Sequence, residues 1–138
     1  MERVLVFIVL YENVHFKLQI FKYSLFFLLP MEKSSFQLVF GSSPTIKVID
    51  FLIEHQEFDY SLTDIAKQSD IAWSTLHQFW PDFVRSSMVQ KTRKIGRAEL
   101  YKLNLQNPLV KKILEMDWLI TKHYAQIELQ KQKIKVKN

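Results

Sequence analysis

Residues 61–80 read SLTDIAKQSDIAWSTLHQFW and contain two short helical patterns separated by a break. Ser61, followed three residues later by Asp64, predicts a capped helix start in which Asp replaces the usual Glu of a capping box. The polar pair at 69–70 ends this helix after about two turns, and a second helix begins near Ala72. Two helices joined by such a short turn form the helix-turn-helix pattern, which decides the fold of the chain.

The second helix of this pair has an apolar face and a face of small polar residues. At about 100° per residue, one face gathers four large apolar side chains: Leu76, Phe79, Trp80 and Phe83. The opposite face carries Ser74 and Gln78, with Thr75 and His77 on its flanks. A Gln side chain can read adenine through two hydrogen bonds, and Ser or Thr can bond a phosphate or a base edge. An ordinary solvent-exposed face is the alternative. Pro81 removes one backbone hydrogen bond and is expected to kink or end this helix.

Residues 88–104, MVQKTRKIGRAELYKLN, predict a β-hairpin. Its second half alternates between apolar and polar residues, and Gly96 lies where a hairpin turn needs a residue that tolerates positive φ. Four cations cluster around this turn: Lys91, Arg93, Lys94 and Arg97. Because a solvated surface hairpin usually mixes both signs of charge, this turn favours an element that contacts phosphates or a minor groove over an ordinary exposed hairpin.

Charge is unevenly distributed along the chain, whose formal net charge is +5. Residues 42–80 hold two positive and six negative side chains, whereas residues 81–112 hold eight positive and two negative ones. A basic block of this kind is typical of a protein with a polyanionic partner.

The composition argues against several chemistries. The chain has no cysteine, which excludes a disulfide scaffold, a thiol nucleophile and cysteine-ligated metal sites. Its two glycines cannot build a P-loop or a dinucleotide-binding loop. The four histidines stand far apart without metal-ligand spacing, and no serine has the surroundings of a catalytic nucleophile. We therefore expect neither an enzyme nor a bound metal or other cofactor.

The segment before residue 61 predicts another helix and a short strand. Ser43 and Pro44 form a helix start signal, with serine as the N-cap and proline at the first helical position. The helix is expected to be largely buried, with a single polar stripe made of Lys47, Asp50 and Glu54. After it, Phe58 and Tyr60 can form a short strand.

A helix, a short strand, a helix-turn-helix and a basic hairpin in this order resemble the winged helix-turn-helix DNA-binding domain. The likeness is to small prokaryotic, archaeal-type transcriptional regulators, and IGRAELYKLN at 95–104 is its most specific piece. It implies an α+β, mainly helical fold, with a basic β-hairpin wing and a long C-terminal helix.

The same resemblance implies which residues contact double-stranded DNA. On the second helix of the pair they are Trp73, Ser74, Thr75 and Gln78. In the wing they are Arg93, Lys94 and Arg97, to which the nearby cation Lys91 is added. Trp73 departs from the family pattern, because it is bulky where a small polar residue is common. Metal-sensing relatives use cysteine clusters, so metal sensing is not expected here.

Asn107 and Pro108 repeat the helix start signal and open a long final helix. One apolar row along it comprises Leu109, Ile113, Met116, Ile120, Tyr124 and Ile127, and a second comprises Leu114, Trp118, Ala125 and Leu129. Because one row suffices to pack on the winged domain, the second favours a partner, most simply the same helix of another subunit. The expected dimer contacts are Leu114, Trp118, Ile120, Tyr124 and Ile127. A helix sandwiched within its own fold is the alternative.

The first thirty residues are apolar but interrupted by charges. Their longest uncharged runs have eight residues each, whereas a spanning helix needs about 20 apolar residues, so a membrane span is not expected. A signal peptide would need an unbroken apolar stretch and a small-residue cleavage site. The change of composition after Pro30 leaves two interpretations open. Either translation starts at Met31, or residues 1–30 are an amphipathic appendage or a weak membrane anchor.

Four segments are expected: a leader at 1–30, a winged domain at 31–106, a dimerisation helix at 107–130 and a basic tail at 131–138. The sequence predicts a cytoplasmic homodimer that binds double-stranded DNA sequence-specifically and regulates transcription. The alternative is a winged helix that serves as a protein-interaction module in a transcription or replication assembly.

Overall fold

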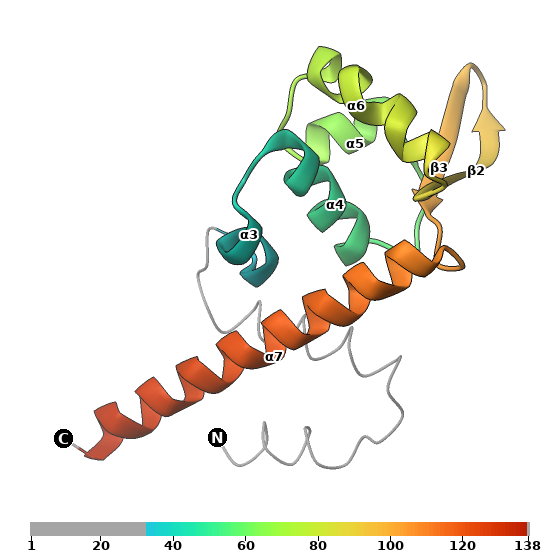
Figure 1. Ribbon diagram of the computed structural model, residues 1–138. Coiled ribbons are helices and arrows are strands. Elements are labelled where there is room, and N and C mark those ends of the chain that lie inside the picture. Colours follow the sequence, from blue (N-terminus) through green and yellow to red (C-terminus); the bar gives the residue numbers. More distant parts are fainter. Residues whose placement is uncertain (1–32, 138) are drawn as a thin grey trace. The chain divides into compact units, whose positions relative to one another are not determined.

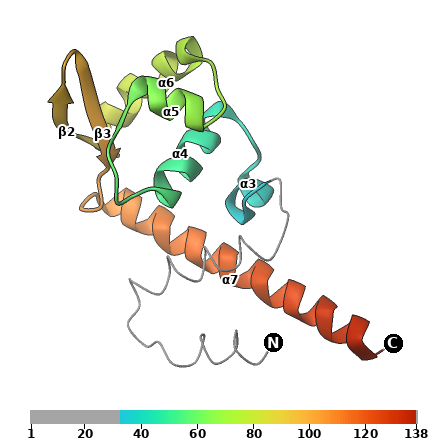
Figure 2. The same ribbon diagram turned by 180° about the vertical axis from the view of Figure 1, so that it is seen from behind.

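The computed structural model describes residues 33–137, so the leader at 1–30 and the choice of Met31 as a start lie outside the described residues. The elements are, in order, α3 (Ser35–Phe40), α4 (Pro44–Glu54), β1 (Tyr60–Ser61), α5 (Leu62–Gln68), α6 (Trp73–Arg85), β2 (Val89–Ile95), β3 (Ala98–Leu103) and α7 (Pro108–Lys137). Residues 33–120 form one compact unit, and α7 continues from Thr121 into a second. In the first unit, α4, α5 and α6 group beside the hairpin of β2 and β3 (Figures 1 and 2).

Helix α4 begins as its start signal predicts, but its expected polar stripe is only partly solvated. The Ser43 hydroxyl accepts a hydrogen bond from the Ile46 amide, and Pro44 occupies the first turn. Asp50, expected on that stripe, is only 4% exposed. Its Oδ2 accepts hydrogen bonds from Ser34 Oγ at 2.8 Å and Gln37 Nε2 at 2.7 Å. Asp50 therefore fastens the start of α3 to α4, because a buried carboxylate needs donors to replace water.

Helices α5 and α6 form the helix-turn-helix that the sequence predicts. The Ser61 hydroxyl accepts from the Asp64 amide at 3.2 Å and also lies 2.6 Å from the Asp64 carboxylate, so the capping residues are those expected. Asp70 turns the chain with a φ of 51°, in the left-handed region that Asp tolerates better than most residues. Its carboxylate pairs with Lys47 at 3.0 Å, which links the turn to α4.

Pro81 was expected to kink or end α6, and it does not end the helix, which continues to Arg85. Trp80 and Phe83, on either side of Pro81, are both buried and hold this part of the helix against the core. Pro81 itself is exposed, so its ring occupies the solvent side of α6. Burial of the flanking aromatic rings outweighs the loss of one backbone hydrogen bond.

The sheet is antiparallel with strand order β1-β3-β2. The short strand predicted before α5 is present at Tyr60 and Ser61, whereas Phe58 lies outside it. Ile95 pairs with Ala98, so Gly96 and Arg97 form the turn of the hairpin. Gly96 has a φ of 59°, which confirms the predicted need for a residue that tolerates positive φ. Residues 89–103 are called the wing below.

The core of the first unit collects apolar side chains from all of its helices and from the base of the wing. The buried members are Phe36, Val48, Phe51, Leu52, Ile53, Ile65, Ala66, Leu76, Trp80, Phe83, Met88, Val89, Leu103 and Val110. The predicted apolar face of α6 therefore packs inward, with Phe79 partly buried at its margin. This arrangement leaves the opposite face of α6 to solvent.

Helix α7 departs from expectation in two respects. It runs to Lys137, so the expected end of the helix near residue 130 is wrong and the basic residues 131–137 continue it. The first predicted apolar row does not pack as a unit, because Leu109 is 52% and Met116 49% exposed. In the second row, Ala125 is buried and Leu114, Trp118 and Leu129 are partly buried. Val110 is buried in the core, and the partly buried residues of α7 that pack against this core come from both rows: Ile113, Leu114 and Ile120. Leu114 and Ile120, expected as dimer contacts, thus pack partly on the core of their own domain.

Candidate nucleic-acid interface

The exposed face of α6 carries the polar side chains that the sequence placed there. Ser74 and Gln78 are exposed, and Thr75 is half-buried at the margin of the core. Trp73, the first residue of the helix, is 54% exposed. Its ring lies against the ring of His77 one turn later, with centroids 3.6 Å apart and an interplanar angle of 40°. This face therefore combines an amide, hydroxyls and one large aromatic surface.

The first turn of α6 also lacks a side-chain cap. Its N-cap is Ala72, which has no side-chain acceptor for the first amide groups, whereas α4 and α5 begin at capping serines. Uncapped amides at a helix start can donate to an anion such as a phosphate.

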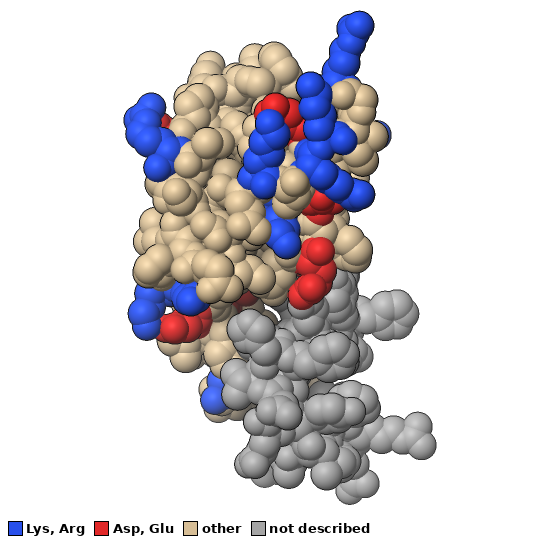
Figure 3. Space-filling model, turned by 90° about the vertical axis from the view of Figure 1, so that its right-hand side faces the viewer, with Lys and Arg blue, Asp and Glu red and all other residues tan. Residues whose placement is uncertain are grey.

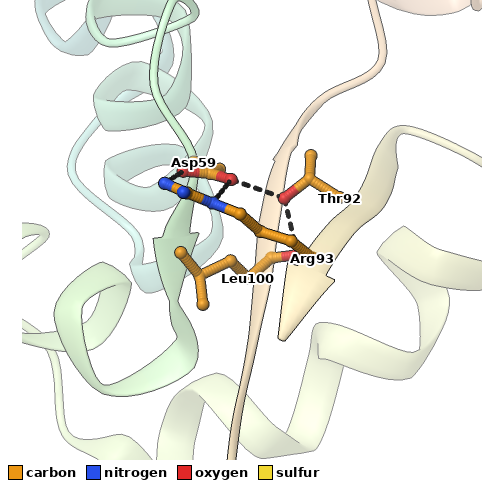
Figure 4. A network of polar contacts seen from close by, with 4 residues as sticks. All are labelled: Asp59, Thr92, Arg93 and Leu100. Atoms are coloured by element: carbon orange, nitrogen blue, oxygen red, sulfur yellow. Dashed lines mark hydrogen bonds and ion pairs between the residues drawn. The ribbon is translucent and has the colours of Figure 1, made fainter. Parts of the chain in front are cut away.

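The wing contains a β-bulge that places Thr92 and Arg93 opposite a single residue of β3. The register shifts between the pairs Lys91–Tyr101 and Lys94–Glu99, so two residues of β2 face Leu100 alone. Figure 4 shows Asp59, just before β1, facing this bulge.

Asp59 binds both residues of the bulge. Arg93 donates from Nε to Oδ2 at 2.9 Å and from Nη2 to Oδ1 at 3.0 Å, and Thr92 Oγ1 donates to Oδ2 at 2.6 Å. The Arg93 guanidinium, with help from Thr92, lowers the pKa of Asp59 from 3.8 to about 2, and Asp59 in turn raises the pKa of Arg93. Two parallel N–H···O bonds between a guanidinium and a carboxylate are the strong form of ion pair. In the protein without DNA, the guanidinium group of Arg93 is therefore paired with the Asp59 carboxylate.

A second carboxylate engages another predicted wing cation. Lys91 forms an ion pair with Glu99 across the hairpin, and Tyr101 Oη donates to Glu99 Oε2 at 2.9 Å. Lys91 is the main cause that lowers the pKa of Glu99, followed by Tyr101. Burial, with help from the bond to Glu99, raises the pKa of Tyr101.

The four predicted wing cations therefore fall into two classes. Arg93 and Lys91 are paired, whereas Lys94 and Arg97 make no ion pair or side-chain hydrogen bond with any residue in the described range 33–137. From the sequence, the turn is predicted to carry a single sign of charge. The structure adds Asp59, which lies 34 residues before Arg93 in the chain. No local pattern signals such a pair.

The start of α6 and the turn of the wing lie at the same end of the first unit, as both ribbon views show (Figures 1 and 2). Figure 3 looks at the side that carries the wing, where Lys and Arg side chains gather with a few Asp and Glu side chains among them. The structure thus brings the start of α6, a helix whose Ser74 and Gln78 are exposed, and the turn of the wing, which Lys94 and Arg97 adjoin, to one end of the domain.

Two further properties concern only residues 33–137. No group of three or more His, Asp or Glu side chains in that range is placed to hold a metal ion. No helix in it is long and apolar enough to cross a membrane.

Comparisons with known proteins identify the fold. No protein-family model and no curated protein matches the sequence. A mutant of Lactococcus lactis ZitR in its apo form is similar in structure, with a TM-score of 0.52 at 15% identity over 72% of this chain and 81% of that one. NadR in complex with 4-hydroxyphenylacetate is similar with a TM-score of 0.51 at 13% identity over 93% of this chain and 89% of that one. Both are winged-helix transcription regulators, and the likeness confirms the predicted winged helix-turn-helix fold.

Proposed function

We propose that this protein binds double-stranded DNA sequence-specifically and regulates transcription. Helix α6 enters the major groove, and the wing contacts the backbone or the adjacent minor groove. The observation that carries the proposal is that the start of α6, a helix with exposed polar side chains, and the turn of the wing, beside the unpaired cations Lys94 and Arg97, lie at one end of the domain (Figure 1). The fold shared with two transcription regulators supports it.

The chemistry of that end suits a duplex. Gln78 offers an amide that can pair with adenine, and Ser74 a hydroxyl for a base edge or a phosphate. Both belong to a helix that the core holds rigidly through Leu76, Trp80 and Phe83. The acidic side chains of residues 42–80 would repel phosphates, and the basic block of 81–112 would draw the DNA toward α6 and the wing.

The protein is further proposed to act as a homodimer in the cytoplasm, paired through α7. The support is the length of this helix, 30 residues, together with the exposed apolar side chains of Leu109, Met116 and Leu119 along its first half. Isolated apolar residues are common on surfaces, but a row of them along one helix favours a partner. A two-fold dimer would present two α6 helices to half-sites about one duplex turn apart.

A binding measurement tests the proposal. A selection from randomised duplexes should yield a preferred sequence, and the affinity for it should fall linearly with salt on a double-logarithmic scale. A protein-interaction module would bind no duplex even at low salt, and that result would refute the proposed function.

A further inference from the structure

Trp73 is the one large aromatic side chain among the exposed residues of the first turn of α6 in the described structure. Its indole N–H makes no hydrogen bond with any residue of the described chain, and its ring contacts the ring of His77. The part of the Trp73 ring that is exposed offers a partner both an apolar surface and a single donor.

The edges of the bases in the major groove differ in what they offer such a side chain. Thymine presents its C5-methyl group beside the O4 acceptor, which matches an apolar ring with one donor. Cytosine presents an N4 donor in place of O4 and has no methyl group, so it would oppose donor to donor. Adenine and guanine present no apolar group on this edge.

We propose that Trp73 is a specificity-determining residue that reads a thymine in the major groove, by packing on the methyl group and donating its indole N–H to O4. The proposal rests on the proposed function and deepens it. His77 is the positioning residue, because its ring lies 3.6 Å from the Trp73 ring on the next turn of the same helix. This stacking limits the rotamers of Trp73 before DNA binds and so reduces the entropy lost on binding.

The experiment uses base analogues in the duplex obtained by selection with the full chain. At each thymine of the half-site, three replacements separate the two contacts. Deoxyuridine removes only the methyl group, 5-methylcytosine paired with guanine keeps the methyl group but replaces the acceptor by a donor, and cytosine changes both. Affinities are measured by fluorescence anisotropy at one salt concentration.

At one thymine position, deoxyuridine should weaken binding of the wild-type protein by about four-fold, the loss expected from one buried methyl group. Cytosine at that position should weaken it by about ten-fold or more, as a mismatched base pair does. Trp73→Ala should bind the thymine and deoxyuridine duplexes equally. Trp73→Phe should keep the sensitivity to deoxyuridine but discriminate less between thymine and 5-methylcytosine.

Two further variants complete the design. Val84→Ala removes an exposed apolar side chain from the other end of α6 and should leave the thymine preference unchanged. His77→Ala should reduce the preference, and His77→Phe should restore it because a ring stacks on Trp73 again. Far-ultraviolet circular dichroism verifies that each variant folds.

The outcomes separate the two proposals. If the wild-type protein binds the duplex but deoxyuridine costs nothing at any position, or the selected half-site contains no thymine, the role of Trp73 is refuted and DNA binding stands. A deoxyuridine penalty that persists in Trp73→Ala refutes it equally, because another residue then reads the methyl group. If no duplex binds at all, the proposed function fails, and the role of Trp73 fails with it.

Discussion

Replacing both Lys94 and Arg97 by alanine should flatten the salt dependence of DNA binding. These two cations have no ion pair within residues 33–137, so each is available to a phosphate. Each neutralised phosphate contributes about −0.9 to the slope of log affinity against log salt, and the double variant should therefore lose about 1.8 units. Between about 50 and 200 mM salt, that difference corresponds to about a twelve-fold smaller loss of affinity. Fluorescence anisotropy with one labelled duplex across this range measures it.

The control removes a wing cation together with its internal partner. The double variant Asp59→Ala and Arg93→Ala leaves the net charge unchanged, because the two side chains neutralise each other. Its affinity should fall, since the bulge of β2 loses its anchor, but its salt slope should flatten by less than that of the variant without Lys94 and Arg97, whose cations it retains. An equal flattening in both double variants would refute the reasoning, because Arg93 would then leave Asp59 and bind a phosphate. An unchanged slope without Lys94 and Arg97 would refute it as well.

Asp59 has its pKa lowered to about 2 from 3.8, so the stability from its pairing is present above pH 4 and lost as the pH falls through about 2. Thermal melting should therefore show a steeper loss of stability from pH 4 to 2 in the wild-type protein than in Asp59→Asn, and parallel losses would contradict the pairing. Gln78→Ala should lose base preference in a duplex selection but keep its salt slope, and an unaltered preference would exclude Gln78 as a reader. Leu76→Ala should lower the free energy of unfolding by about 2–5 kcal/mol in a denaturant titration, because Leu76 is fully buried, whereas the exposed Val84→Ala should cost far less. Analytical ultracentrifugation at micromolar concentration should show a dimer, and a monomer alone would overturn the proposed pairing through α7.

Local signals predicted much of the fold because their partners lie within one helical turn or one hairpin. The serine caps at Ser43 and Ser61 act on amides three residues ahead, and Asn107 accepts from the Leu109 and Val110 amides at the start of α7. Gly96 was predictable for the same reason, since the φ of a turn residue depends on the turn itself. The three- and four-residue spacing of the large apolar side chains in α6 predicted which face of this helix is buried, and therefore which face is exposed.

Tertiary contacts decided the features that the sequence did not predict. The spacing of Asp50 along α4 predicts an exposed polar residue. Asp50 is nevertheless buried, because its hydrogen-bond donors, Ser34 and Gln37, come from the N-cap and the first turn of α3. Pro81 breaks an isolated helix, yet the burial of Trp80 and Phe83 carries α6 past it. Such outcomes depend on which elements pack together, and the pattern along a single element does not contain that information.

The wing shows how such a tertiary contact changes a functional interpretation. The sequence shows four cations around the turn and does not distinguish between them. In the structure, Arg93 forms an ion pair with Asp59, and Lys91 forms one with Glu99. The pairing of Asp59 with the bulge joins the segment before the helix-turn-helix to β2. Because an ion pair formed before binding adds no counterion release, we expect Arg93 to act in the proposed DNA binding through the placement of the wing, and Lys94 and Arg97 through their charge. The acidic segment at 42–80 therefore does more than repel phosphates. Its Asp59 carboxylate anchors the bulge of the wing, and the proposed function requires this wing.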